Sequence, residues 1–299
     1  MENGIVPERL IGIIGGTGLG EYLSREGGGE SVEVDTPFGR PSGPLMRADW
    51  HGAKVVFLNR HGPGHLLNPS NVPYRANIFA LKQLGVTHIL ASGAVGSLRE
   101  DIAPGQLVIC DQVIDRTRER ERTFFDNGIV VHAELAEPFC PALRSVLLDC
   151  AGDVDTTVHD GGTYVVMEGP QFSTRAESMM HRQLGGHVIG MTCMPEARLA
   201  REAEICYALV ALATDYDCWR PHQGGADKKA LLAEIIGNLN EATANAAALV
   251  GAAVQRLALK TPAACSCQQA LELAIWSDRS RVDKSLVRRL APLIGRYFG

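Results

Sequence analysis

The sequence contains no Cys-x-x-Cys pair, although it has eight cysteines. Zinc modules usually take their ligands from such closely spaced pairs, so the spacing predicts no metal site. Most of the cysteines stand in apolar stretches and are predicted to be buried free thiols. Cys265 and Cys267 are the exception, because they share a polar segment near the C-terminus. Free thiols in a reducing cytosol, a redox pair and a tight disulfide all stay open for them.

The chain also lacks an excess of basic residues. Its 29 Lys and Arg stand against 34 Asp and Glu, for a net charge of -5, which disfavours non-specific binding to nucleic acid or an anionic membrane. The Arg-rich stretch 115–122 alternates in sign and predicts a solvated loop or helix face. No apolar run reaches the roughly 18 residues of a membrane-spanning helix, and no secretory signal begins the chain. We therefore expect a cytoplasmic protein with no nucleic-acid partner and no membrane partner.

Aromatic residues are scarce at 6%, whereas hydrophobic residues make up 45% of the 299 positions. This composition is that of an ordinary globular protein. Short apolar runs bounded by turn residues predict buried strands, and apolar spacing near about 3.6 predicts helices between them. Strands are predicted at 10–14, 54–59, 87–92, 106–110, 162–167, 187–191 and 205–213, and helices at 74–84, 175–184, 195–203 and 226–259.

This alternation predicts a single α/β domain over residues 10–260, with three layers and a central mixed β-sheet flanked by helices. A polar break follows the longest helix, and two more helices are predicted at 268–276 and 285–297. Residues 261–299 are too few for a domain. We expect them to form a helical extension that packs on the body or on a neighbouring subunit.

Two segments that follow strands could bind an anion. The segment GGTG, with Gly16 and Thr17, follows the first strand, where backbone N–H groups can point at a phosphate. It is neither a dinucleotide fingerprint nor a P-loop, and a plain tight turn is the alternative. Arg60 and His61 follow the second strand and suit a dianion. A surface arginine beside a capping histidine is the alternative there.

Two further segments could contact a flat ring. Small residues leave the third strand at 91–97, which lets a ring or an oxyanion approach the backbone or else marks close strand–helix packing. Phe172 stands in a polar loop just before a predicted capping box of Ser173 or Thr174 with Glu177. Phe172 could stack on a base, and a satellite of the core is the plainer interpretation.

Asp215 and Asp217 leave the end of a very apolar strand and are predicted to project to the same side. Burial raises a carboxyl pKa, which suits a general acid that must be protonated near neutrality. An Asx turn with solvated carboxylates is the alternative.

Five segments in this order, GIIGGTG, TPFGRPS, RHG, GPQFSTRAES and ATDYDCW, resemble the 5'-methylthioadenosine phosphorylase branch of the trimeric purine nucleoside phosphorylases. The resemblance extends from about Ile11 to about Asn245. It implies a nucleoside phosphorylase fold, a homotrimer or a dimer of trimers, and active sites near the subunit interfaces. It also implies that no metal or organic cofactor takes part, since inorganic phosphate is a co-substrate.

The resemblance implies a role for each matching residue. The phosphate site would comprise Gly16, Thr17, Arg60, His61, Ser92, Ala94 and Thr192, with His61 also catalytic. The purine would lie against Phe172, Asp215, Asp217, Val95 and Gly96, with Asp215 as the acid that protonates N7. The ribose and its 5' group would meet Met191, Leu231, Leu232 and His132 of an adjacent subunit.

The two aspartates favour a 6-aminopurine, because the exocyclic amine of adenine donates hydrogen bonds to a carboxylate, whereas hypoxanthine and guanine present an acceptor. The predicted reaction is phosphorolysis of 5'-methylthioadenosine to adenine and 5-methylthioribose 1-phosphate, a step of purine and methionine salvage. The alternatives are a phosphorylase of adenosine, inosine, guanosine or 5'-methylthioinosine, a hydrolytic nucleosidase, and a non-catalytic nucleoside sensor.

Three positions depart from the family pattern. Gly93 replaces a threonine that usually helps to bind phosphate, so a donor is lost unless Ser92 supplies it. Val95 replaces a cysteine, which is a mild change. Lys228 stands in a window that is usually apolar, so this chain either shifts its helix register or accepts a more polar 5' group.

Overall fold

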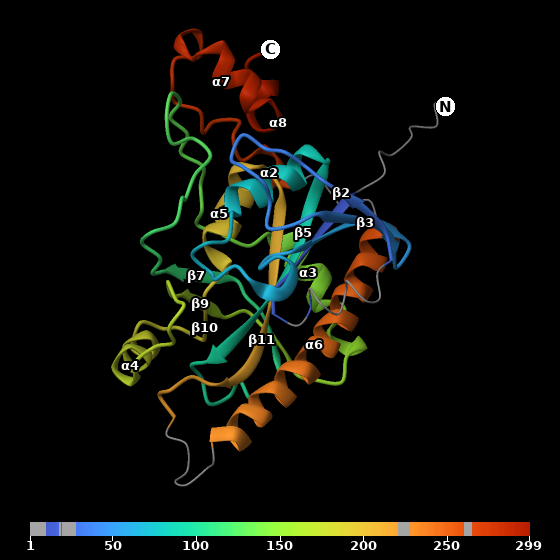
Figure 1. Ribbon diagram of the computed structural model, residues 1–299, viewed down its shortest axis with the longest axis vertical. Helices are drawn as coiled ribbons and strands as arrows, with labels where there is room; N and C mark the ends of the chain where they lie inside the picture. Colours follow the sequence, from blue (N-terminus) through green and yellow to red (C-terminus); the bar gives the residue numbers. More distant parts are fainter. Residues whose placement is uncertain (1–9, 18, 20–27, 221–227, 260–264) are drawn as a thin grey trace.

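The structure, a computed structural model, describes residues 10–17, 19, 28–220, 228–259 and 265–299 (Figure 1). Its centre is one mixed β-sheet in the order β2-β3-β4-β1-β5-β10-β9-β7, and β11 pairs with β5 and with β6, which in turn pairs with β8. The predicted α/β class with a central mixed sheet is confirmed. The strands are β1 (Leu10–Gly15), β2 (Glu30–Val32), β3 (Leu45–Trp50), β4 (Ala53–Asn59), β5 (Val86–Ser97), β6 (Leu107–Ile109), β7 (Gln112–Asp115), β8 (Val158–Asp160), β9 (Thr163–Val166), β10 (Val188–Gly190) and β11 (Cys206–Tyr216).

Four neighbouring strands are parallel. β1 runs parallel to β4 and to β5, and β5 runs parallel to β11. Their carboxyl ends therefore lie along one edge of the sheet, where ligand sites of α/β proteins typically form. β5 and β11 are longer than the predicted strands 87–92 and 205–213. This extension places Gly96 and Asp215 within paired strands rather than in loops.

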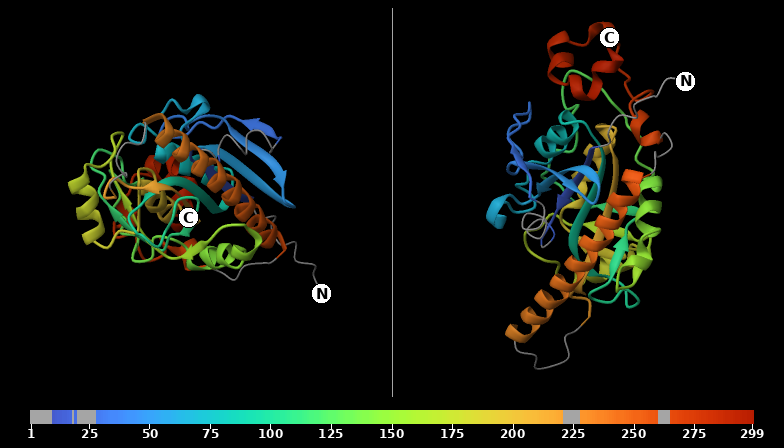
Figure 2. Two further views of the ribbon diagram at one scale, coloured as in Figure 1. Left: turned by 90° about the horizontal axis from the view of Figure 1, so that it is seen from below. Right: turned by 90° about the vertical axis from the view of Figure 1, so that its right-hand side faces the viewer.

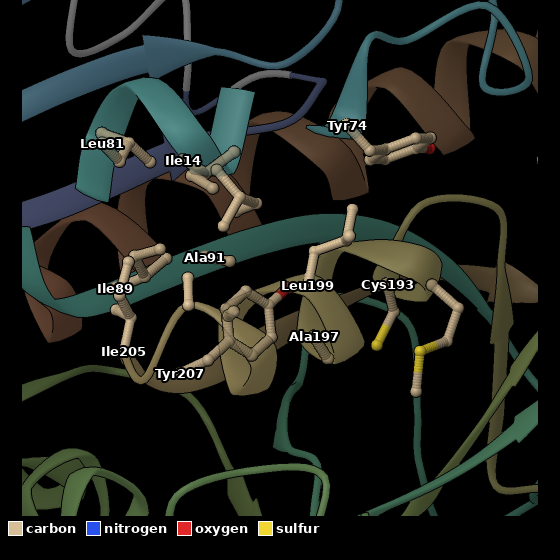
Figure 3. Packing of buried hydrophobic residues seen from close by; sticks show 14 of the residues in the cluster. Ile14, Tyr74, Leu81, Ile89, Ala91, Cys193, Ala197, Leu199, Ile205 and Tyr207 are labelled. Atoms are coloured by element: carbon tan, nitrogen blue, oxygen red, sulfur yellow. The ribbon is translucent and has the colours of Figure 1, made fainter. Parts of the chain in front are cut away.

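Helices cover both faces of the sheet and bury two apolar clusters (Figure 2). Figure 3 shows the first cluster, in which residues of α2 such as Leu81 and residues of α5 such as Leu199 pack together with strand residues such as Ile89. The second cluster packs α3 and α6 against the opposite face. The helices are α2 (Tyr74–Gln83), α3 (Pro141–Leu148), α4 (Arg175–Gln183), α5 (Cys193–Glu202), α6 (Lys228–Leu259), α7 (Lys284–Arg289) and α8 (Ala291–Ile294), with short 3-10 turns at Pro63–His65, Ala151–Asp153, Ser266–Gln269, Arg279–Arg281 and Gly295–Tyr297.

The long helix α6 matches its prediction from Lys228 onward, and residues 226–227 lie outside the described chain. Its segment Leu232–Leu259 is long and apolar enough, with a hydropathy of 1.2, to span a membrane. However, 56% of the apolar 18-residue stretch within this segment is buried inside the protein, and α6 packs along β11. It is therefore placed like the core helix of a globular protein.

The C-terminal extension departs from the two helices predicted for it. In place of a helix at 268–276, the chain pairs with the body, where Val131 and Ile275 form a β-bridge. In place of one helix at 285–297, α7 ends and α8 begins around Leu290, because Pro292 in the first turn of α8 has no N–H with which to continue the preceding helix.

The extension packs against α2 rather than standing alone, and its side chains, such as Leu271 and Leu293, join the first apolar cluster. Glu204, buried at the turn after α5, holds it. The Glu204 carboxylate accepts hydrogen bonds from the Leu271 backbone N–H at 3.0 Å and the Tyr297 hydroxyl at 2.6 Å, and it pairs with Arg296 at 2.8 Å.

Several short elements have weak signals in the sequence and were not predicted. Strands β2, β3, β7 and β8 are mostly three to six residues long and only partly buried, so they lack a continuous apolar run. Helix α3 begins at Pro141, a residue whose fixed φ suits the first helical turn. None of these elements alters the edge at which β1, β4, β5 and β11 end.

Candidate active site

The ends of β1 and β4 bring the glycine loop to Arg60. Gly15 pairs with Asn59 in the sheet, and the Arg60 backbone N–H donates to the Gly15 carbonyl at 3.0 Å. A Cβ atom on Gly16 would lie only 2.7 Å from Arg60 Nη1 and 2.9 Å from the Ser92 carbonyl oxygen. The loop needs glycine here because the guanidinium passes directly beneath its backbone. Thr17 is exposed at the turn that follows.

Arg60 is fully buried and is fixed from three sides. Its Nε and Nη2 each donate to the Glu196 carboxylate at 2.7 Å, and its Nη1 donates to the Ser92 carbonyl at 2.8 Å. The Tyr207 hydroxyl donates to Glu196 Oε1 at 2.7 Å. Burial alone would lower the pKa of Arg60, but the Glu196 carboxylate raises it above its ordinary value. The surface-arginine alternative is therefore wrong.

Glu196 is a functional residue that the sequence pattern did not predict. It lies in the first turn of α5 and is buried, yet it follows Pro195 in a segment that looks like an ordinary helix start. A buried arginine requires a carboxylate partner. Had Arg60 been expected to be buried, this requirement would have pointed to an acidic residue such as Glu196. Glu196 neutralises the net charge of Arg60. Arg60 therefore contributes oriented N–H groups rather than an uncompensated positive charge.

His61 follows Arg60 and is almost completely buried. Its Nδ1 lies 2.8 Å from the Leu67 carbonyl, and its ring stacks on His65 at 4.3 Å. Burial, followed by the Arg60 charge, lowers the pKa of His61 to about 4. A carbonyl can only accept, so Nδ1 carries the proton of the neutral ring and Nε2 is left as an acceptor. His61 thus acts as a donor from Nε2 only after it is protonated.

The small-residue stretch of β5 lies beside the start of α5. Ser92 is buried, and its Oγ has no hydrogen-bond partner among the described residues. A Cβ atom on Gly93 would lie 3.5 Å from the Thr192 Oγ1. Buried hydroxyls without partners are rare, and an anion would satisfy this one. Ser92, Gly93 and Thr192 therefore lie together with the Arg60 guanidinium, while Ala94, two residues beyond Ser92 on β5, is half-buried.

A β-bulge positions the two aspartates. The β5–β11 register pairs Ala213 with Val95 and Asp215 with Gly96, so Thr214 is the additional residue. A Cβ atom on Gly96 would lie 3.1 Å from both Asp215 Oδ1 and Asp217 Cβ. Both aspartates therefore lie against the same glycine, beside a β-bulge of the kind that is common next to active sites.

Each aspartate has a different environment. Asp215 Oδ2 accepts a 3.2 Å hydrogen bond from the Thr214 hydroxyl. Asp217 is held by its backbone N–H, which donates to the Ser97 carbonyl at 3.0 Å, and its Oδ2 is buried without a hydrogen-bond partner in the described chain. Trp219 Nε1 donates to the same Ser97 carbonyl at 2.8 Å and fixes the loop that follows. The solvated Asx-turn alternative does not fit a buried, unpaired Oδ2.

The loop between β9 and α4 presents Phe172 to solvent. Phe172 is 85% exposed, so its interpretation as a satellite of the core is wrong. The capping box after it is confirmed, because the Thr174 hydroxyl and the Glu177 carboxylate bond each other's backbone N–H groups. Earlier in the loop, a Cβ atom on Gly169 would lie 2.6 Å from the Met191 sulfur. Met191 is therefore packed beneath this loop.

The Arg-rich stretch contains a buried arginine, which corrects the prediction of a solvated face. Arg120 donates to the Met191 carbonyl at 2.5 Å and the Met194 carbonyl at 2.7 Å, and it pairs with Glu168 at 3.0 Å. Burial alone would raise the pKa of Glu168, but hydrogen bonds led by that from Ser70 lower it to about 2. Alternating charges do not reveal which member of the series turns inward.

Three predicted residues are not joined to this arrangement. His132 is exposed and lies against Trp276 of the extension, with ring centroids 5.2 Å apart. Its segment lies beside α7, at the end of the molecule opposite the carboxyl end of β11 (Figure 1). Leu232, in the first turns of α6, is 57% exposed. The side chain of Leu231 lies outside what the structure describes, as does that of Lys228, the residue that departs from the family pattern.

Comparisons with known proteins agree over nearly the whole chain. Residues 10–255 match the Phosphorylase superfamily. The S-methyl-5'-thioadenosine phosphorylase of Geobacter sulfurreducens is 47% identical over 97% of this chain and 99% of its own length. That of Cereibacter sphaeroides is 46% identical over 96% of this chain and 98% of its own.

Two solved structures share the fold. A methylthioadenosine phosphorylase from an antarctic soil metagenomic library has a TM-score of 0.86 and 43% identity, covering 96% of this chain and 99% of its own. A double mutant of the adenosine/methylthioadenosine phosphorylase of Schistosoma mansoni, in complex with adenine, has a TM-score of 0.82 and 33% identity, covering 90% of this chain and 100% of its own.

Removing the Glu196 carboxylate should destabilise the protein strongly, because it leaves the Arg60 charge buried without a partner. We expect Glu196→Ala to lower the free energy of unfolding by about 3–5 kcal/mol, measured by urea denaturation. Tyr207→Phe deletes only one hydroxyl of the same network and should cost about 1 kcal/mol. Equal, small losses in both variants would contradict the account of Arg60 as a charge held by Glu196.

His61 should respond to phosphate. In phosphate-free protein, NMR of labelled histidines should show His61 titrating near its lowered pKa of about 4. A dianion within hydrogen-bond reach of Nε2 favours the imidazolium, so saturating phosphate should raise this pKa. His61→Gln assigns the resonance, and the exposed His51 is the control that should not move. A His61 pKa that phosphate leaves unchanged would remove this residue from the anion site.

Proposed function

This chain belongs to the phosphorylase superfamily, in the branch of the methylthioadenosine phosphorylases, and on that basis we propose that it catalyses reversible phosphorolysis of 5'-methylthioadenosine. The products are adenine and 5-methylthioribose 1-phosphate. The single observation that carries the proposal is the β-bulge at Thr214, which sets Asp215 and Asp217 together over Gly96.

The phosphate half of the site is supported by the region below the glycine loop. Arg60 has more N–H donors than its three bonds use, Ser92 Oγ is unpaired among the described residues, and the Thr192 hydroxyl is close by. These groups are fixed before a ligand arrives, which lowers the cost of ordering them around a phosphate. Ser92 and Thr192 supply hydroxyls near the position where Gly93 offers none.

The purine half is supported by the two carboxyl groups. Cleavage of the glycosidic bond places positive charge on the sugar and negative charge on the departing base. Bound phosphate stabilises the sugar, and Asp215 as a general acid protonates N7 of the base. The buried Asp217 Oδ2, which has no hydrogen-bond partner among the described residues, accepts from the 6-amino group of adenine. Phe172 is exposed beside the loop and is available to stack on the ring.

The 5' end of the nucleoside requires a second subunit under this proposal. Met191 lies beneath the β9–α4 loop, whereas the segment that carries His132 pairs with the C-terminal extension, at the opposite end of the molecule. His132 can serve the site only from an adjacent copy, which is the reason to propose a homotrimer or a dimer of trimers. We also propose a cytoplasmic location, a role in purine and methionine salvage, and a reaction that uses phosphate but no metal or organic cofactor.

Replacing the proposed acid should abolish most turnover. Asp215→Asn removes the proton source, so kcat for methylthioadenosine phosphorolysis should fall by about 10²–10⁴-fold, measured by the release of adenine. Asp155→Asn is the matched control, because it changes an exposed aspartate that is not among the site residues, and it should keep full activity. An Asp215→Asn enzyme with more than about a tenth of the activity would contradict the acid role.

Asp217 should set the choice of base. Asp217→Asn replaces a pure acceptor by an amide that also donates, so kcat/KM should fall for methylthioadenosine and rise for inosine. The ratio of kcat/KM for methylthioadenosine to kcat/KM for inosine should fall by about a few tens-fold, which corresponds to the loss of about one charged hydrogen bond. If the ratio stays unchanged while the protein remains folded, Asp217 does not read the 6-position.

A further inference from the structure

Four of the eight cysteines, scattered in sequence, converge in space. They come from three separate segments: one is at the start of α3, one begins β11, and two belong to the extension. The four Sγ atoms all lie within 4.8 Å of one another, and two of them are 3.5 Å apart. The four residues are Cys140, Cys206, Cys265 and Cys267.

These distances match a metal-binding cage better than paired disulfides. Zinc held by four thiolates at about 2.3 Å in a tetrahedron places the sulfurs about 3.8 Å apart. A disulfide would bring two sulfurs to about 2.05 Å, whereas all eight cysteines of this structure are free. A closed tetrahedral set of four sulfurs is typical of structural zinc.

The surroundings also suit a charged centre. Cys140, Cys206 and Cys267 are each at most 2% exposed, so the sulfurs are shielded from water. Zinc with four thiolates carries a net negative charge, and buried charge needs compensation. The buried Arg201 donates a hydrogen bond to the Glu137 carbonyl, three residues before Cys140, so its positive charge lies near this end of α3 and can supply part of that compensation.

We propose that Cys140, Cys206, Cys265 and Cys267 bind one structural zinc ion that fastens the C-terminal extension to the body. On binding, each thiol loses its proton and the four sulfurs close around the metal. The ion would lie at the amino end of β11, while Asp215 lies near the carboxyl end of the same strand. The zinc is therefore separate from the phosphorolysis site and takes no part in its chemistry.

Fastening the extension has a structural consequence. Beyond the cysteines, the extension pairs with the body through the Val131–Ile275 bridge. The His132 backbone N–H also donates a hydrogen bond to the Ala274 carbonyl at 2.9 Å. Zinc would thus hold in place the segment that presents His132 to solvent. The role of His132 rests on the proposed function, whereas the zinc site does not depend on that function.

The test is the metal content of the purified full-length protein, measured by elemental mass spectrometry, together with a count of its free thiols. We expect about one zinc per chain in the wild type. Cys265→Ser removes the least buried ligand and should lose most of the zinc, whereas Cys218→Ser, outside the cluster, should keep it. Should Cys265→Ser fail to fold, cobalt exchange into the wild type replaces it, with tetrahedral thiolate absorption bands expected.

A thermal readout separates this claim from activity. Chelation of zinc should lower the Tm of the wild type and of Cys218→Ser, and leave that of Cys265→Ser nearly unchanged. The proposal is overturned by a wild type that holds no zinc, whether its eight thiols are all free or four of them are oxidised to two disulfides. Neither result bears on phosphorolysis, which the Asp215 variant tests.

Discussion

The buried pair of Arg60 and Glu196 is the constraint on which the site depends. A guanidinium with no solvent exposure can exist only with a carboxylate held against it, and here a β-strand end and a helix start supply the two partners. The pair fixes the distance between β4 and α5. It also forces a glycine at position 16 and orients the Ser92 carbonyl, so the anion site is formed by the same contacts that hold the layers together.

The purine side of the site depends on the β-bulge at Thr214. One additional residue in β11 shifts the register beside Gly96 and turns two carboxylates to one side of the sheet edge. Because β5 and β11 are otherwise buried and continuous, the bulge is held in place by the core rather than by the ligand. Arg120, which reaches three backbone carbonyls, holds the β9–α4 loop and the Met191 segment in the same manner.

Much of this could be predicted from sequence, and the remainder fails for physical reasons. Apolar periodicity located the central strands and α6, and the spacing of Asp215 and Asp217 predicted their shared side. Glu196 and Arg120 were missed because burial of a charge depends on a partner distant in sequence, at a separation of 136 residues for Arg60 and Glu196. The cysteine cluster was missed likewise, since its ligands come from three segments and local spacing carries no sign of it.

The central claim is that phosphate attacks a methylthio-substituted adenine nucleoside. The most direct measurement is the rate of base release from methylthioadenosine, adenosine and inosine by the purified protein, each with and without phosphate. We predict phosphate-dependent release of adenine, fastest from methylthioadenosine. Release that continues unchanged without phosphate, or that is fastest from inosine, would contradict it.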